Sequence, residues 1–174
     1  TNLFLDPDAA FAAVKNGDVD IAEVQLCYAN ETVPGYHMEY FDSIDVRGIS
    51  LPTQKADGKL SEDNVTIGNN VTGDPAIREA LNIGIDRQKL LDGAFNGYGN
   101  VSYTGVAGQL PWAFESSFKD NQVDQAKAVL ASAGWNDTNG DVIVEKDGQP
   151  AAFSVYYNSK ATERQAIAVA VAEQ

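Results

Sequence analysis

The stretch from residue 74 to residue 91 carries the clearest structural pattern in the chain. Apolar side chains recur in it every three to four positions, the period that places them on one side of a helix; they are Ile77, Leu81, Ile85, Leu90 and Leu91. Asp74 can accept hydrogen bonds from the first free amides of that helix, and Pro75 suits the first helical position, where a missing N–H costs nothing. Because Gly84 forms a soft joint and Asp86 offers a second start, we expect two short helices that each bury one face.

Hydrophobic periodicity and turn residues predict the other elements. Helices are expected at 7–17, at 124–133, at 162–174 and from residue 86 to Gly93 or Gly97. Strands are expected at 19–25, 44–51, 65–69, 142–145 and 152–157, with tight turns at 57–58 and 147–148. The Gly- and Pro-containing segment 98–117 is expected to be a long loop held by aromatic anchors.

Residues 77–87 resemble a signature of the family 5 extracellular solute-binding proteins, and the resemblance continues in order through 96–99, 110–112, 124–135 and 155–159. Members of this family deliver oligopeptides, dipeptides, nickel complexes and related solutes to ABC importers. The resemblance implies binding without chemistry: two lobes close over a solute, and the closed form docks on permease subunits. The implied partners are therefore a small solute, an oligopeptide or a metal chelate, and an ABC permease.

The resemblance also implies a fold class and a place in a larger protein. Residues 1–174 correspond to part of the C-terminal lobe of a two-lobed protein, with the first lobe and a distal C-terminal segment absent. We expect an α/β fold, a mixed α+β sheet with flanking helices, as in an incomplete lobe of the type II periplasmic-binding-protein kind.

The loop 158–161 is the first candidate for contact with a solute. It lies between an expected strand and an expected helix, where free N–H groups and side chains converge on ligands in open α/β sheets. In peptide-binding relatives the corresponding turn lies beside the solute, so the resemblance implies that Tyr157, Asn158 and Ser159 face a cleft. The alternative is a capped helix start that binds nothing.

Three further residues are weaker candidates for the same cleft. The family varies with its ligand at the positions of Lys160 and Glu163, so the resemblance carries these two over less firmly. Trp112, which follows Pro111 in the aromatic loop, can stack on a bound solute, and packing over an adjacent helix is the alternative.

Charge and composition narrow the partners. A formal net charge of −13, from 25 acidic and 12 basic residues, repels phosphate backbones and anionic bilayers, which argues against nucleic-acid or direct membrane binding. No run approaches the roughly 20 apolar residues of a membrane helix, and residues 1–3 lack the features of a signal peptide. The resemblance implies an extracytoplasmic location, in the periplasm or as a lipoprotein on the outer face of the membrane, with any export segment or anchor missing from this sequence.

No cofactor, metal site or enzyme is expected. Cys27 and His37 are single residues of their kinds, and no catalytic motif such as GxSxG, HExxH or a Walker loop is present. The segment 137–141 has the oxygen spacing of a calcium loop, but Val142 and Gly148 stand where an EF-hand needs Gly and Glu, which favours turn chemistry. Two alternatives to solute binding remain: a calcium-stabilised extracellular interaction module, and a carboxylate-dependent hydrolase.

Five Asn-x-Ser/Thr sequons begin at Asn30, Asn64, Asn70, Asn100 and Asn136. In a chain rich in Asn and Thr, we attribute them to chance.

Overall fold

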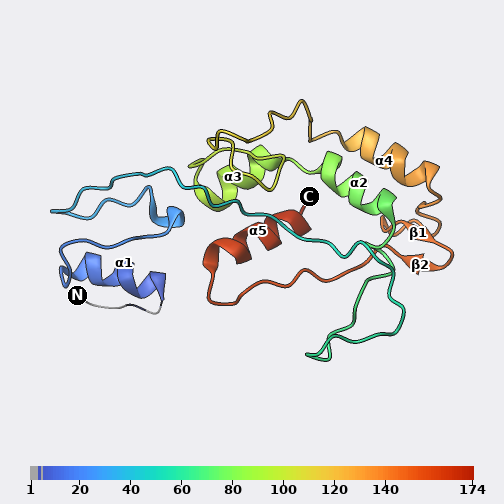
Figure 1. Ribbon diagram of the computed structural model, residues 1–174, viewed down its shortest axis with the longest axis horizontal. Coiled ribbons are helices and arrows are strands. Elements are labelled where there is room, and N and C mark those ends of the chain that lie inside the picture. Colours follow the sequence, from blue (N-terminus) through green and yellow to red (C-terminus); the bar gives the residue numbers. More distant parts are fainter. Residues whose placement is uncertain (1–3, 5) are drawn as a thin grey trace. The chain divides into compact units, whose positions relative to one another are not determined.

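The computed structural model describes residues 4 and 6–174. Residues 1–3, on which the comparison with a signal peptide rests, lie outside this part. The chain forms two compact units. Figure 1 labels the helices and strands that they contain. Unit 1 contains the described residues up to Arg47 together with Arg87–Ser116 and Tyr157–Gln174, and unit 2 contains Gly48–Asp86 and Ser117–Tyr156.

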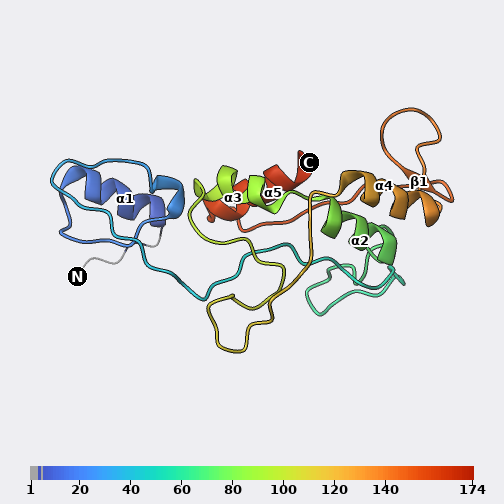
Figure 2. The ribbon, with the colours of Figure 1, turned by 90° about the horizontal axis from the view of Figure 1, so that it is seen from above.

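Unit 2 is built on a pair of helices. Helix α2 (Pro75–Gly84) begins after Asp74, whose carboxylate accepts a hydrogen bond from the Ala76 amide at 3.0 Å. It packs along α4 (Val123–Ser132), and the two lie side by side in Figures 1 and 2. Small side chains allow the close approach, because a Cβ placed on Gly84 would lie 3.1 Å from the Cβ of Ala126.

A second cluster in unit 2 joins the start of α2 to a hairpin. Val71, Ile77 and Trp135 are buried together. The hairpin pairs β1 (Glu145–Lys146) with β2 (Gln149–Pro150) in antiparallel register, through a turn at Asp147 and Gly148 that have φ of 52° and 77°. Positive φ at both central residues is typical of the type I′ turn that connects two-residue hairpins.

In unit 1, α1 (Pro7–Asn16) starts at Asp6, whose side chain accepts from the Asp8 amide, and ends at Gly17 with φ of 74°. Its Phe11 is buried and stacks on Tyr28 of the 3₁₀ helix η1 (Leu26–Tyr28), with ring centroids 4.3 Å apart. Helix α3 (Arg87–Phe95) packs against α5 (Thr162–Ala172). All five α-helices expected from the sequence are confirmed, within a few residues at their ends.

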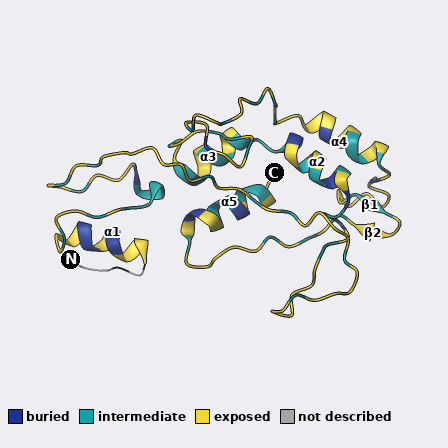
Figure 3. Ribbon diagram, in the orientation of Figure 1, coloured by how far each residue is buried: buried dark blue, intermediate teal, exposed yellow. Residues whose placement is uncertain are grey.

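The expected strands are mostly wrong. Residues 19–25, 44–51 and 152–157 form no ladder within the described part of the chain, and 65–69 contributes a single bridge, between Leu60 and Thr66. Of 142–145, only Glu145 belongs to a strand. An alternating sequence becomes a strand only when another strand satisfies its N–H and C=O groups. Here apolar side chains of these segments stay exposed, as at Ile21 (88%) and Ile44 (66%), and Figure 3 shows the irregular parts of the chain mostly in the colours of exposed and intermediate residues. The fold is therefore mixed α and β, as expected, but its sheet is small.

Among the described residues, every helix is too short or too polar to cross a bilayer.

Candidate functional site

The candidate turn before α5 exists and is exposed. Asn158 closes it twice, because its side-chain oxygen accepts from the Lys160 amide at 3.0 Å and its carbonyl accepts from the Ala161 amide at 2.9 Å. Tyr157, Asn158, Ser159 and Lys160 are all exposed to solvent. The structure thus brings four of the six candidate residues together on one turn of unit 1, with an amide, two hydroxyls and an ammonium available to a ligand.

Helix α5 starts without a side-chain cap. Its N-cap residue is Ala161, which has no polar side chain, so Asn158 serves the preceding turn and not the helix. The capped helix start considered for this segment is therefore not what forms. The first amides of a helix carry partial positive charge when no side chain accepts from them, which suits a carboxylate or another electron-rich group.

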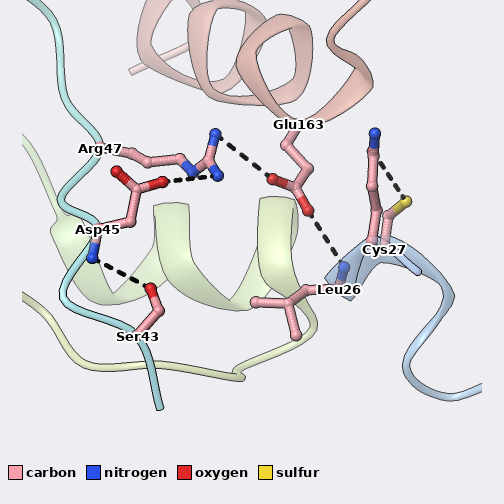
Figure 4. Close-up of polar contacts among 7 residues, drawn as sticks. Leu26, Cys27, Ser43, Asp45, Arg47 and Glu163 are labelled. Carbon is pink, nitrogen blue, oxygen red and sulfur yellow. Dashed lines mark hydrogen bonds and ion pairs between the residues drawn. The ribbon is translucent and has the colours of Figure 1, made fainter. Parts of the chain in front are cut away.

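Glu163 lies on the same helix but is buried, with only 8% of its surface exposed. One carboxylate oxygen accepts from the Leu26 amide at 3.1 Å, and the other lies 3.8 Å from the Arg47 guanidinium (Figure 4). Arg47 in turn pairs with Asp45 at 2.8 Å. Glu163 therefore links the start of α5 to η1 and to the segment that contains Arg47.

The Glu163 cluster also affects the thiol of Cys27, which lies in η1. Burial, with the negative charges of Glu163 and Asp8, raises the pKa of this thiol. A thiol held in its protonated form is a poor nucleophile and a poor metal ligand. The raised pKa therefore favours the protonated thiol of Cys27 at neutral pH.

Trp112 stands apart from the turn. Its side chain is 74% exposed, so it is not packed over an adjacent helix, and no hydrogen bond or ring contact in the described chain joins it to residues 157–160. Exposed aromatic surface of this kind is available to a ligand or to another part of a protein.

Two hollows of about 410 and 430 Å³ lie elsewhere in unit 1, between α3 and α5. Their walls include Gly93 from α3 and Ala170 and Glu173 near the end of α5. None of the six candidate residues lines either hollow.

The acidic loop of unit 2 follows turn chemistry. Both oxygens of Asp137 accept backbone amides, from Gly140 at 2.7 Å and Val142 at 3.0 Å, and these bonds hold the pKa of Asp137 below its usual value. Asp141 and Glu145 bring carboxylate oxygens within 4.8 Å of it. One oxygen of Glu145 accepts from both the amide and the hydroxyl of Thr138, so this carboxylate also takes part in holding the loop.

The comparisons with known proteins decide the family. The family model for bacterial extracellular solute-binding proteins, family 5, middle region, matches residues 2–174. The chain belongs to the family 5 extracellular solute-binding proteins.

Three curated relatives agree with this membership. The nickel-binding periplasmic protein of Escherichia coli K12 is 32% identical over 86% of this chain, and the oligopeptide-binding protein AppA of Bacillus subtilis is 36% identical over 61%. Protein XP55 of Streptomyces lividans is 30% identical over 96%. The matched regions make up only 27%, 20% and 28% of those proteins, so the chain spans between a fifth and somewhat over a quarter of their lengths.

A solved structure supports the fold. The structure of AppA from Bacillus subtilis in complex with a nonapeptide superposes with a TM-score of 0.61 at 24% identity, covering 98% of this chain and 32% of that one. The expected solute-binding-protein fold is thereby confirmed.

Proposed function

We propose that this chain is part of the C-terminal lobe of a two-lobed receptor that captures a solute for an ABC-type importer and leaves it chemically unchanged. The observation that carries the proposal is the family match over residues 2–174. Two of the relatives are named as binding proteins, for nickel and for oligopeptides. The fraction of each relative that is matched supports a lobe and not a whole receptor.

The exposed turn is the part of the chain best suited to contact the solute. Asn158 offers an amide, Ser159 a hydroxyl and Lys160 an ammonium, beside a helix start whose amides no side chain caps. Tyr157 adds a partly exposed ring. Such a set recognises a carboxylate, which both an oligopeptide and a metal chelate can present. Trp112 would complete the contact by stacking, and Glu163 would act by holding the start of α5 in place.

The mechanism needs no catalytic group. The second lobe would close over the solute, and enclosure together with satisfied polar ends would provide the affinity. The closed receptor would then dock on permease subunits. The location proposed for the intact protein is extracytoplasmic, either free in the periplasm or held at the outer face of the membrane by a lipid anchor.

Binding by the full-length receptor tests the proposal. Isothermal titration calorimetry with an oligopeptide mixture and with a nickel chelate would show which class binds, and mass spectrometry of the recovered solute would show whether it is altered. We expect saturable binding of one class, an unaltered solute, and at least about tenfold weaker binding in the double variant Asn158→Ala, Lys160→Ala.

Lys119→Ala is the matched control, because this lysine is exposed but lies in unit 2. Equal losses in the two variants would remove the turn from the site. A hydrolysed solute would replace the binding function with an enzymatic one.

A further inference from the structure

The number of glycosylation sequons is larger than the composition explains. The chain has 13 asparagines, and 17 of its 174 residues are serine or threonine, so a random order would give about one Asn-x-Ser/Thr triplet. Five occur, and all five asparagines are exposed and lie outside the helices. Chance, the explanation favoured from the sequence, accounts poorly for this number.

A sequon is usable when both the asparagine amide and the hydroxyl two residues later are accessible, since the transferase must reach both. Two sequons are not accessible in this sense, because their side chains are already hydrogen-bonded or buried. The Asn30 side chain accepts a hydrogen bond from the Tyr98 hydroxyl at 3.3 Å. Asn70 accepts from the Ala56 amide at 3.2 Å, and the hydroxyl residue of its sequon, Thr72, is only 1% exposed.

In two more sequons the hydroxyl group already donates a hydrogen bond within the protein. In the sequon of Asn100, the Ser102 hydroxyl donates to a backbone carbonyl two residues later, at 2.8 Å. In the sequon of Asn136, the Thr138 hydroxyl donates to the Glu145 carboxylate at 2.9 Å. Each of these four sites would have to break a tertiary or turn contact before it could be modified.

The sequon at Asn64 is different. Within the described residues, neither the Asn64 side chain nor the Thr66 hydroxyl has a polar partner, and Asn64 occupies the tip of a turn with φ of 59°. The loop that carries this turn projects from α2 and α4 in Figure 1. Three backbone hydrogen bonds hold it, two of which form the bridge between Leu60 and Thr66, together with one bond from the Val65 amide to the Ser61 hydroxyl at 3.2 Å. Little structure must therefore open for an enzyme to bind the segment.

We propose that Asn64 is the attachment site of an N-linked oligosaccharide. The donor would be an oligosaccharide carried on a lipid phosphate. The Asn64 Nδ2 atom forms a bond to C1 of the first sugar, the bond from C1 to the phosphate oxygen breaks, and the lipid phosphate leaves with the electron pair. The proton lost from Nδ2 passes to a base of the transferase. The inference rests on the extracytoplasmic location in the proposed function, because the modifying enzyme works on exported chains.

Exposed apolar side chains surround Asn64, and a glycan there would cover them. Leu60, Val65 and Ile67 expose between 42% and 63% of their surfaces beside it. A bulky, hydrophilic group attached at the tip would shield these apolar side chains from other proteins.

The test uses the full-length protein purified from the extracytoplasmic fraction of its native host. Trypsin cuts after Lys59 and Arg78, so one peptide contains both Asn64 and Asn70, and electron-transfer fragmentation tells them apart. We expect a glycan mass on Asn64, lost in Thr66→Ala and retained in Thr66→Ser. Thr72→Ala is the matched control in the same peptide and should leave the mass in place.

An exported protein with an unmodified Asn64 overturns the proposal and leaves solute capture untouched, as does a glycan that survives Thr66→Ala. A protein that carries the glycan on Asn64 but binds neither the peptides nor the nickel chelate supports this inference while removing the proposed function. The two proposals therefore fail on different measurements.

Discussion

Asp74 serves three neighbours with one carboxylate. It caps α2 through the Ala76 amide, accepts from the Trp135 indole N–H at 3.1 Å, and pairs with the Lys146 ammonium at 2.8 Å. The hydrogen bond from Lys146 is the main reason that the pKa of Asp74 lies below its ordinary value. Because the folded pKa is lower than the unfolded one, the charged carboxylate stabilises unit 2 above about pH 4, and this contribution is lost as the pH falls through the folded pKa.

Replacing Asp74 by asparagine removes the charge and keeps the shape. We expect Asp74→Asn to lower the free energy of unfolding by about 1–3 kcal/mol at pH 7 and to flatten the loss of stability on acidification. Urea denaturation between pH 3 and pH 7 measures both. Asp57→Asn is the matched control, since Lys59 also lowers the pKa of Asp57 but that carboxylate is exposed and should matter little. Equal losses in both variants would contradict this account.

Glu163 makes a testable contact across 137 positions of sequence, with the amide of Leu26. Glu163→Gln keeps an oxygen acceptor and loses the charge that faces Arg47, whereas Glu163→Ala also strands the Leu26 amide. We expect a cost of about 1 kcal/mol for the first variant and about 2–3 kcal/mol for the second. Hydrogen exchange at the Leu26 amide should accelerate in Glu163→Ala and hardly change in Glu23→Ala, which alters an exposed carboxylate. An unchanged exchange rate at Leu26 would remove Glu163 from this structural role.

At the scale of elements, Gly134 is required by its backbone conformation, whereas Gly93 is not. Gly134 ends α4 with φ of 86°, while the Gly134 amide donates to Ala131 and the Trp135 amide to Leu130, the paired bonds of a Schellman motif. Gly93 lies inside α3, and a Cβ placed there would meet nothing within 4 Å.

The same substitution should therefore change stability in opposite directions. We expect Gly134→Ala to destabilise the protein by about 1 kcal/mol, because alanine resists positive φ. Gly93→Ala should stabilise it by about 0.5–1 kcal/mol through better helix propensity. Melting temperatures of the two variants measure the signs, and a shift in the same direction for both would refute the assignment.

The helices could be predicted from the sequence because their hydrogen bonds are local. Asp74, Pro75 and the spacing of Ile77 and Leu81 specify α2 without reference to any distant residue. The strand expected at 19–25 was wrong, because an alternating pattern gives only a preference for extended structure and a strand also needs a partner strand to pair with. At the candidate site, the turn at Asn158 followed from local chemistry, whereas the burial of Glu163 depends on Leu26 and Arg47, which no local pattern connects to it.

For the whole molecule, the proposed closure of two lobes makes a quantitative prediction. Residues 1–174 would provide one wall of the cleft, so the isolated polypeptide should bind the solute at least about a hundredfold more weakly than the full-length receptor. Isothermal titration calorimetry of the isolated polypeptide and of the full-length receptor, with the same solute, compares the two affinities. Equal affinity would mean that the whole site lies within these 174 residues, and the two-lobed mechanism would be wrong.

The segments around Ile21 and Phe41, which form no strand and expose large apolar side chains, have a consequence for handling the isolated polypeptide. Open backbone edges flanked by apolar side chains recruit like edges from neighbouring copies, which is how intermolecular sheets begin. The net charge of −13 keeps copies apart at low ionic strength, and added salt screens that repulsion. Raising the salt concentration should therefore move the isolated polypeptide from dispersed chains towards precipitation.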